Sequence, residues 1–349
     1  MQAKTILGVA LLVLFTLACG NTVAEWPPDL SPKETGSIDE ERLAEGIDGV
    51  VALSLDTEKL WVSGTTTDFG DVVVQVPTTG EGAPEAVGQR QVWLLTTSRT
   101  GLWEAGLTKD VRYTPHADGQ TTTIGEGNVR GLHAADRWVC VVWFDEAEGL
   151  TSIEARHDDQ PRLQHFERAV KGEPLWDPLH GSVVARPDGS CVVAMTTGIH
   201  IYENDGSSHL ISQIATPAGA MGMTTYWTAQ NGTWSLSNEE DELTRLADHK
   251  VLLVADNWGY RAVEEDYTSP TTIPGMGETT KLIVGIERVR LGEEAAPMES
   301  LVTTPTVIEE AIGSFTVGGG YLYWSSNKGY IARKALPADE PEPVVEAPK

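Results

Sequence analysis

One short pattern recurs seven times along the chain: an apolar run, a polar turn that contains Gly, and a run in which apolar and polar residues alternate. Alternation with a period of two is typical of a half-buried β-strand, and a polar Gly turn between two such runs indicates a β-hairpin. A repeated unit of this size buries its apolar face by packing on its neighbours. The copies lie at residues 59–77, 91–107, 138–158, 191–205, 224–238, 251–265 and 320–336.

Several copies follow a short strand of small residues, such as "GVVALSLDTE", "GSVVARPDG" and "GSFTVGGG". A small-residue strand, a hairpin and a weaker fourth strand together describe one four-stranded antiparallel blade of a β-propeller. The repeats occupy residues 46–336, which divide into seven blades of about 42 residues or six of about 49. The seven hairpins favour seven blades. Six stays the alternative because only 27 residues separate Gly232 from Gly259, whereas 70 separate Gly259 from Gly329.

The repeats also resemble known propeller families. "YLYWSSNKGYIARKAL" (321–336) is similar to the repeat of YWTD propellers, and "TTYWTAQNG" (224–232) is a second, shorter match. "ARPDGSCVVAMTTGIHIYENDG" (185–206) resembles the repeat of NHL and related extracytoplasmic sensor propellers. The aspartate of the YWTD motif is replaced by Ala229 and Ser326, so the ligand surfaces of the receptor propellers do not carry over. The chain as a whole looks like a secreted bacterial β-propeller lipoprotein of unassigned function.

The N-terminus "MQAKTILGVALLVLFTLACGN" resembles a bacterial lipoprotein signal. Lys4 precedes an apolar run that is too short to span a bilayer, and small residues lead to Cys19. Residues 1–18 are therefore expected to be removed, with Cys19 acylated as a membrane anchor. Thr16 stands where such signals usually have Leu, so an ordinary secretory peptide cut near Ala18 is the alternative. In the lipoproteins that the chain resembles, the absence of Asp after the cysteine favours the outer membrane.

Two segments flank the repeats. Residues 19–45 are acidic and Pro-rich without strand alternation, and we interpret them as a flexible tether with one helical turn at "DEERLAE". Residues 337–349, "PADEPEPVVEAPK", have the composition of a disordered tail. The predicted folded domain is thus a single β-propeller over residues 46–336.

The charge balance excludes some classes of binding partner. The chain has 51 acidic and 25 basic residues, a net charge of −26, which repels nucleic-acid phosphates and anionic lipid headgroups. Contact with a membrane is expected through the lipid anchor only. A protein or glycan ligand is compatible with this surface, and the oligomeric state is not indicated.

Cys140 and Cys191 remain as an even pair in an oxidising compartment, so a disulfide between them is one expectation. The alternative is two buried free thiols, since equivalent strands of neighbouring repeats usually lie too far apart to bridge.

No catalytic set, metal site or cofactor site is predicted. The eight histidines do not occur in short metal-binding spacings, and no nucleophile elbow or phosphate-binding loop is present. The acidic stretch 237–249 lacks the spaced acids of a calcium loop. One loop is a weak candidate for a catalytic or metal site, and equally for an ordinary polar surface loop; its residues are His157, Asp158, Asp159 and His165.

Tryptophan is frequent, with eleven residues against five Phe. Five lie on predicted strands and are expected to pack between blades rather than to form a ligand platform: Trp61, Trp93, Trp138, Trp227 and Trp324. Three lie at or after turns and are expected to be more exposed: Trp103, Trp234 and Trp258. In the last repeat, Tyr323 and Ile331 are expected to face a neighbouring sheet.

These observations favour a binding or scaffolding module of the bacterial cell envelope over an enzyme. Two alternatives stay open: a periplasmic propeller enzyme, a hydrolase or lyase that uses loop carboxylates or histidines, and a structural subunit of an envelope assembly. Because the repeats explain the architecture, function is expected in the non-repeating loops 145–149, 156–180 and 263–280.

Overall fold

The structure is a computed structural model. It describes residues 28–31, 40–106, 109–117, 119–175, 182–212, 215–221, 224–229, 232–236, 243–247, 250–268, 279–292, 296–304 and 310–338. Within these ranges the regular secondary structure consists of β-strands alone. Nor do the described residues include a helix with the length and apolar character that crossing a membrane requires. Cys19 and most of the predicted tail lie outside them.

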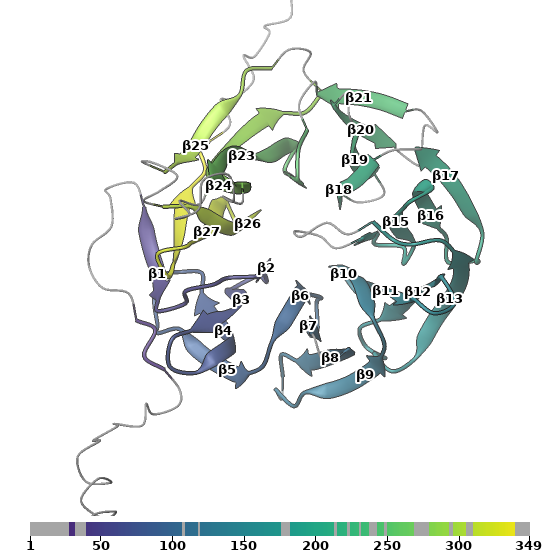
Figure 1. The fold of residues 1–349 in the computed structure, drawn as a ribbon, viewed down its shortest axis with the longest axis horizontal. Coiled ribbons are helices and arrows are strands. Elements are labelled where there is room, and N and C mark those ends of the chain that lie inside the picture. The colour runs from purple at the N-terminus through teal and green to yellow at the C-terminus, as the bar shows by residue number, and fades with distance from the viewer. Residues whose placement is uncertain are drawn as a thin grey trace, which may run out of the picture.

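The strands form a ring of antiparallel sheets around a central axis (Figure 1). Five sheets have four strands each, in chain order from the centre outward. They comprise β2(Ala52–Leu55), β3(Lys59–Thr66), β4(Gly70–Pro77) and β5(Glu85–Gln89); β6(Val92–Thr97), β7(Gly101–Gly106), β8(Asp110–Pro115) and β9(Thr122–Glu126); β10(Val129–Ala135), β11(Trp138–Asp145), β12(Leu150–His157) and β13(Gln164–Lys171); β14(Val183–Ala185), β15(Cys191–Met195), β16(Gly198–Tyr202) and β17(Ser208–Ser212); and β18(Ala215–Met221), β19(Thr224–Ala229), β20(Gly232–Leu236) and β21(Leu243–Ala247).

The remaining eight strands form one larger sheet made of two runs of four. A single residue pair, Ile283 with Ile312, joins the two runs. Taken as separate sets of four, the strands of the described residues make seven sets. The predicted class, an all-β propeller of four-stranded antiparallel sheets, is confirmed. The runs are β22(Leu253–Ala255), β23(Trp258–Thr268), β24(Thr279–Arg290) and β25(Glu299–Thr303), followed by β26(Ile312–Gly318), β27(Tyr321–Ser326), β28(Tyr330–Ala335) and β1(Glu41–Glu45).

The last set is completed by the N-terminal strand β1, which pairs antiparallel with β28. Glu41 lies opposite Arg333 and Glu45 opposite Tyr330. Residues 41–45 were expected to belong to the tether and to a helical turn, and this expectation is wrong. The sequence "ERLAE" has a high helix propensity, but pairing with the edge of β28 and burial of Leu43 outweigh it. The folded domain therefore begins before residue 46.

In strands β27 and β28, alternate side chains of one repeat pack against the two neighbouring blades. Tyr323 and Ile331 pack in the core cluster of the first blade, as predicted. Leu322 and Trp324, which flank Tyr323 in β27, pack on the other side with side chains from β23–β25. Successive side chains point to opposite faces of a strand, so the Tyr-Trp pattern fills both inter-blade cores.

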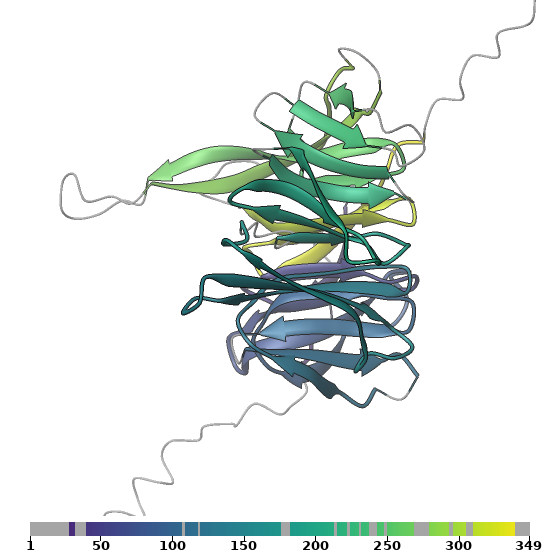
Figure 2. The ribbon, with the colours of Figure 1, turned by 90° about the vertical axis from the view of Figure 1, so that its right-hand side faces the viewer.

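The strands β23 and β24 form a long hairpin that extends beyond the disc of the propeller (Figure 2). Residues 263–280 were expected to be an inserted loop. For 263–268 and 279–280 this is wrong, because both stretches are strand, while 269–278 lie outside the described residues. The exposed part of the hairpin is mainly acidic: Glu264, Glu265 and Asp266 are exposed on β23, and Asp266 lies opposite Lys281 of β24.

The tryptophan predictions hold in part. Trp61, Trp227 and Trp324 are buried as expected. Trp93 is 42% exposed, which contradicts the prediction, because it points into the centre of the ring rather than between blades. Trp103 is fully buried although it follows a turn: its ring packs on Tyr113, and its Nε1 donates a hydrogen bond to Ser98 Oγ.

Candidate binding site

A cavity of about 800 Å³ opens on the face that carries the turns between the first and second strands of successive blades. These turns follow β2, β6, β10 and β26. Its lining comes from six separate segments, which are Leu55–Thr57, Thr78–Thr79, Thr97–Arg99, Asp136, the β26–β27 hairpin and Arg333 of β28. We call it the closure pocket, because it lies where the last and first blades meet. The loops singled out from the sequence are not among its described lining residues.

One wall of the closure pocket is built around Arg333 of β28. Its guanidinium lies 4.5 Å from the ring centre of Tyr321 and 2.7 Å from Glu41 Oε2 of β1. It also donates hydrogen bonds to the backbone oxygens of Thr78 and Thr79, which follow β4. One side chain thus links three strands from opposite ends of the chain and fixes the aromatic wall.

Tyr323 contributes a second aromatic ring, 6.2 Å from that of Tyr321. Burial raises the pKa of its phenol, although Arg333 opposes this shift. The hydroxyl is therefore neutral at physiological pH and serves as a hydrogen-bonding group on an aromatic surface, not as a base.

The facing wall is polar. Thr97 Oγ1 donates to Leu55 O at 2.8 Å, which ties β6 to the end of β2. Asp56 lies 3.2 Å from His116 Nε2. Arg99 and Asp136 are exposed at the rim, and Arg99 N–H donates to Asp136 O. The pocket thus offers aromatic surface, hydroxyls and charges of both signs, a set suited to binding a polar ligand.

A smaller cavity, of about 250 Å³, lies at the centre of the ring. Strands β2, β6, β10, β22 and β26 line it, and its surface is more polar than apolar, although Trp93, Leu253 and Phe315 also lie on it. His133 of β10 also lines it, but its Nδ1 accepts a hydrogen bond from Ala185 N–H of β14 at 3.1 Å. That bond links two blades, so we regard His133 as a structural residue.

Three of the four predicted loop residues lie together at the end of β12. His157, Asp158 and Asp159 bring one donor atom each to within 4.8 Å of one another. His165 is not part of this set; its ring packs edge-on against Trp138, which also contacts His157. The sequence thus located a real cluster, but not its fourth member.

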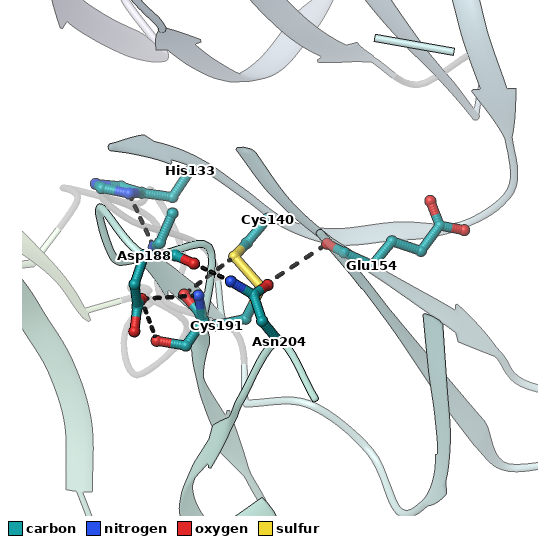
Figure 3. Close-up of a disulfide and its surroundings, with 8 residues drawn as sticks. His133, Cys140, Glu154, Asp188, Cys191 and Asn204 are labelled. Atoms are coloured by element: carbon teal, nitrogen blue, oxygen red, sulfur yellow. Dashed lines mark hydrogen bonds between the residues drawn. A yellow bond between two sulfur atoms is a disulfide. The ribbon is translucent and has the colours of Figure 1, made fainter. Parts of the chain in front are cut away.

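Cys140 of β11 and Cys191 of β15 form a disulfide between neighbouring blades, with their Cα atoms 5.8 Å apart (Figure 3). The expectation that equivalent strands lie too far apart is wrong here, because this separation is within the range that a disulfide spans; Cys140 is the third residue of β11 and Cys191 the first of β15. The adjacent turn is held by Asp188, whose Oδ1 accepts hydrogen bonds from Ser190 N–H and Oγ–H. Neither cysteine is available as a nucleophile in this form.

No protein-family model matches this sequence, and no curated protein matches it. Solved structures, in contrast, match its fold. Virginiamycin B lyase from Staphylococcus aureus aligns with a TM-score of 0.52 and 12% identity, covering 85% of this chain and 98% of the other. YCF48 bound to a D1 peptide aligns with a TM-score of 0.50 and 11% identity, and the alignment covers 87% of this chain and 99% of YCF48.

PorZ, described as an essential bacterial surface component of the type-IX secretion system of Porphyromonas gingivalis, gives a TM-score of 0.52 and 11% identity. The alignment covers 86% of this chain and 40% of PorZ. At such low identity these likenesses show architecture alone. The chain is a β-propeller.

Proposed function

We propose that this protein is a binding module of the bacterial cell envelope that holds a protein or peptide ligand in the closure pocket. The observation that carries the proposal is the composition of that pocket: fixed aromatic rings on one wall, and hydroxyls with exposed Arg99 and Asp136 on the other. Aromatic anchors surrounded by polar groups are the usual composition of peptide-binding surfaces. Because Arg333 and the turn bonds hold the walls in place, little ordering cost accompanies binding.

One fold neighbour supports a peptide ligand, and a second supports a place in the bacterial envelope. YCF48 was solved with a D1 peptide, and PorZ is described as a component of a secretion system at the bacterial surface. All of these neighbours, the lyase included, share the fold alone, so the proposed ligand class rests on the composition of the closure pocket.

We further propose that acylation of Cys19 tethers the propeller to the envelope, at the outer membrane rather than the inner. The support is the signal-like N-terminus. Replacement of Cys19 by Ala should release the protein from the membrane fraction and change its mature mass. If both stay as in the wild type, the anchor proposal is wrong, while the pocket proposal is unaffected.

Site-specific photocrosslinking in cells tests the binding function. A photoreactive residue replaces Thr57 or Thr79, which are exposed at the pocket, or Glu85, which is exposed on the outer strand β5 as a control. We expect discrete protein adducts from the two pocket positions and none from position 85. Equal adducts from all three positions, or none from the pocket, would contradict the proposal.

A further inference from the structure

We propose that His157, Asp158 and Asp159 form a binding site for one divalent transition-metal ion. The site lies where β12 ends and the turn to β13 begins, on consecutive residues. His157 Nδ1 is 3.7 Å from Asp158 Oδ1 and 3.6 Å from Asp159 Oδ2. An ion bound at about 2.1 Å from each ligand in tetrahedral geometry separates ligand atoms by roughly 3.4 Å. The two distances from His157 Nδ1 lie within a few tenths of an ångström of this value, and the three donors as a set lie within 4.8 Å of one another, so the two carboxylates adjust around the ion. The ion also replaces the long hydrogen bond, 3.4 Å, that His157 Nδ1 accepts from Asp159 N–H.

The second observation is an unsatisfied buried carboxylate. The side chain of Asp158 is fully buried, and its Oδ2 accepts a hydrogen bond from Thr100 N–H at 3.2 Å. Its Oδ1, the oxygen that faces His157, is buried without a hydrogen-bond partner. A buried carboxylate oxygen with no partner is costly, and a bound cation offsets that cost.

The neighbouring positive charge of Arg137 does not compete strongly with the ion. Arg137 Nη1 lies 3.2 Å from Asp159 Oδ2, but both side chains are well exposed, so this surface pair contributes little and is easily displaced. The ring of His157 packs at right angles on Trp138, with 5.0 Å between ring centres, which orients the imidazole. An oriented imidazole is typical of metal-binding histidines.

The donor set determines the class of ion. One imidazole nitrogen and two carboxylate oxygens suit Zn²⁺ and similar transition metals, whereas Ca²⁺ and Mg²⁺ prefer oxygen donors alone. The hydrogen bond from Thr100 to Asp158 joins the site to the β6–β7 turn, whose Ser98 and Arg99 line the closure pocket. A bound ion would therefore brace one rim of that pocket, but the site stands independently of the pocket's ligand.

Calorimetric titration of the untagged full-length protein with ZnCl₂ tests the site. We expect one ion per chain and an affinity at least tenfold lower in Asp158→Asn and His157→Gln. Asp158→Asn keeps an oxygen for Thr100, so the turn should stay folded. His165→Gln, which removes a histidine beside the same tryptophan, is the matched control and should bind like the wild type.

X-ray absorption at the zinc edge of the loaded protein supplies an independent readout. The expected spectrum contains one imidazole and otherwise oxygen ligands, and a 100-fold excess of CaCl₂ should leave it unchanged. Absence of zinc binding, equal affinity in all variants, or a spectrum without imidazole would each overturn the proposal.

Discussion

Two junctions of the ring join neighbouring blades in different ways. Between the third and fourth sets of strands, the Cys140–Cys191 disulfide crosses the interface covalently, beside a core of buried aliphatic side chains. Between the last and first sets, β1 completes the sheet by hydrogen bonds and Leu43 fills the core. The closure pocket lies at this second junction. We propose that the covalent junction serves stability, whereas the non-covalent one combines closure of the ring with the proposed ligand site.

The largest expected effect comes from the core of the non-covalent junction. Leu43→Asp places an unpaired carboxylate at a site only 4% exposed, next to the first-blade core. We expect a loss of about 4 kcal/mol in unfolding free energy or more, and a fall in Tm of about 10 °C, by thermal denaturation. Leu163→Asp, at a site 60% exposed, is the control and should change stability by about 0.5 kcal/mol at most. A small loss in Leu43→Asp would show that β1 does not close the ring.

The covalent junction should give the next largest effect. Replacing both Cys140 and Cys191 by Ser removes a cross-link between residues 51 positions apart. Loop-closure entropy then predicts a loss of about 4 kcal/mol. Reductant should lower the Tm of the wild type to about that of the double variant, and it should leave the Tm of the double variant unchanged. If reductant affects both proteins equally, the disulfide does not contribute to stability.

A smaller effect is expected from the side chain that links closure to the pocket. Arg333→Met keeps the apolar stem but removes the bonds to Glu41 and to the backbone oxygens of Thr78 and Thr79. We expect a loss of about 2 kcal/mol in denaturant unfolding. Arg99→Met, at the exposed rim of the same pocket, should be near neutral; equal losses in the two variants would argue against the linking role of Arg333.

The smallest effect concerns pH. Burial raises the pKa of Glu40, which precedes β1, above its ordinary value of 4.5. The folded state therefore holds the proton more tightly, and the contribution of Glu40 to stability is lost as pH rises through the raised pKa. Glu40→Gln should raise the Tm by about 1 °C at pH 7 and have no effect at pH 4. A benefit that grows on acidification would contradict this sign.

Much of the architecture could be predicted from the sequence because each repeat shows the strand alternation and the turn of one β-hairpin. Alternation in residues 320–336 predicted that Tyr323 and Ile331 face a neighbouring sheet, and both lie in the first-blade core. Local pattern failed where partners far away in the sequence decide the structure. "ERLAE" is a strand because β28 offers an edge some 290 positions later, and Trp93 is exposed because its strand lines the centre of the ring.

The two candidate sites also differ in whether they are formed by residues that are near or far apart in the sequence. The cluster at His157 is local, so one loop of sequence sufficed to propose it. The closure pocket is built from six segments, and its aromatic wall belongs to a repeat that the sequence indicated to be purely structural. Tyr321 and Arg333 were missed because the repeat pattern that explains their strands hides their position at the ring closure.

The most direct test of the account measures the Thr57 photocrosslink in three backgrounds, each assayed at a temperature where it is folded. We predict that the adduct persists in the Cys140→Ser, Cys191→Ser variant, which alters only the covalent junction. It should be lost in Arg333→Met, which disrupts the wall of the closure pocket. An adduct that survives in Arg333→Met and disappears without the disulfide would contradict the assignment of the ligand site to the closure junction.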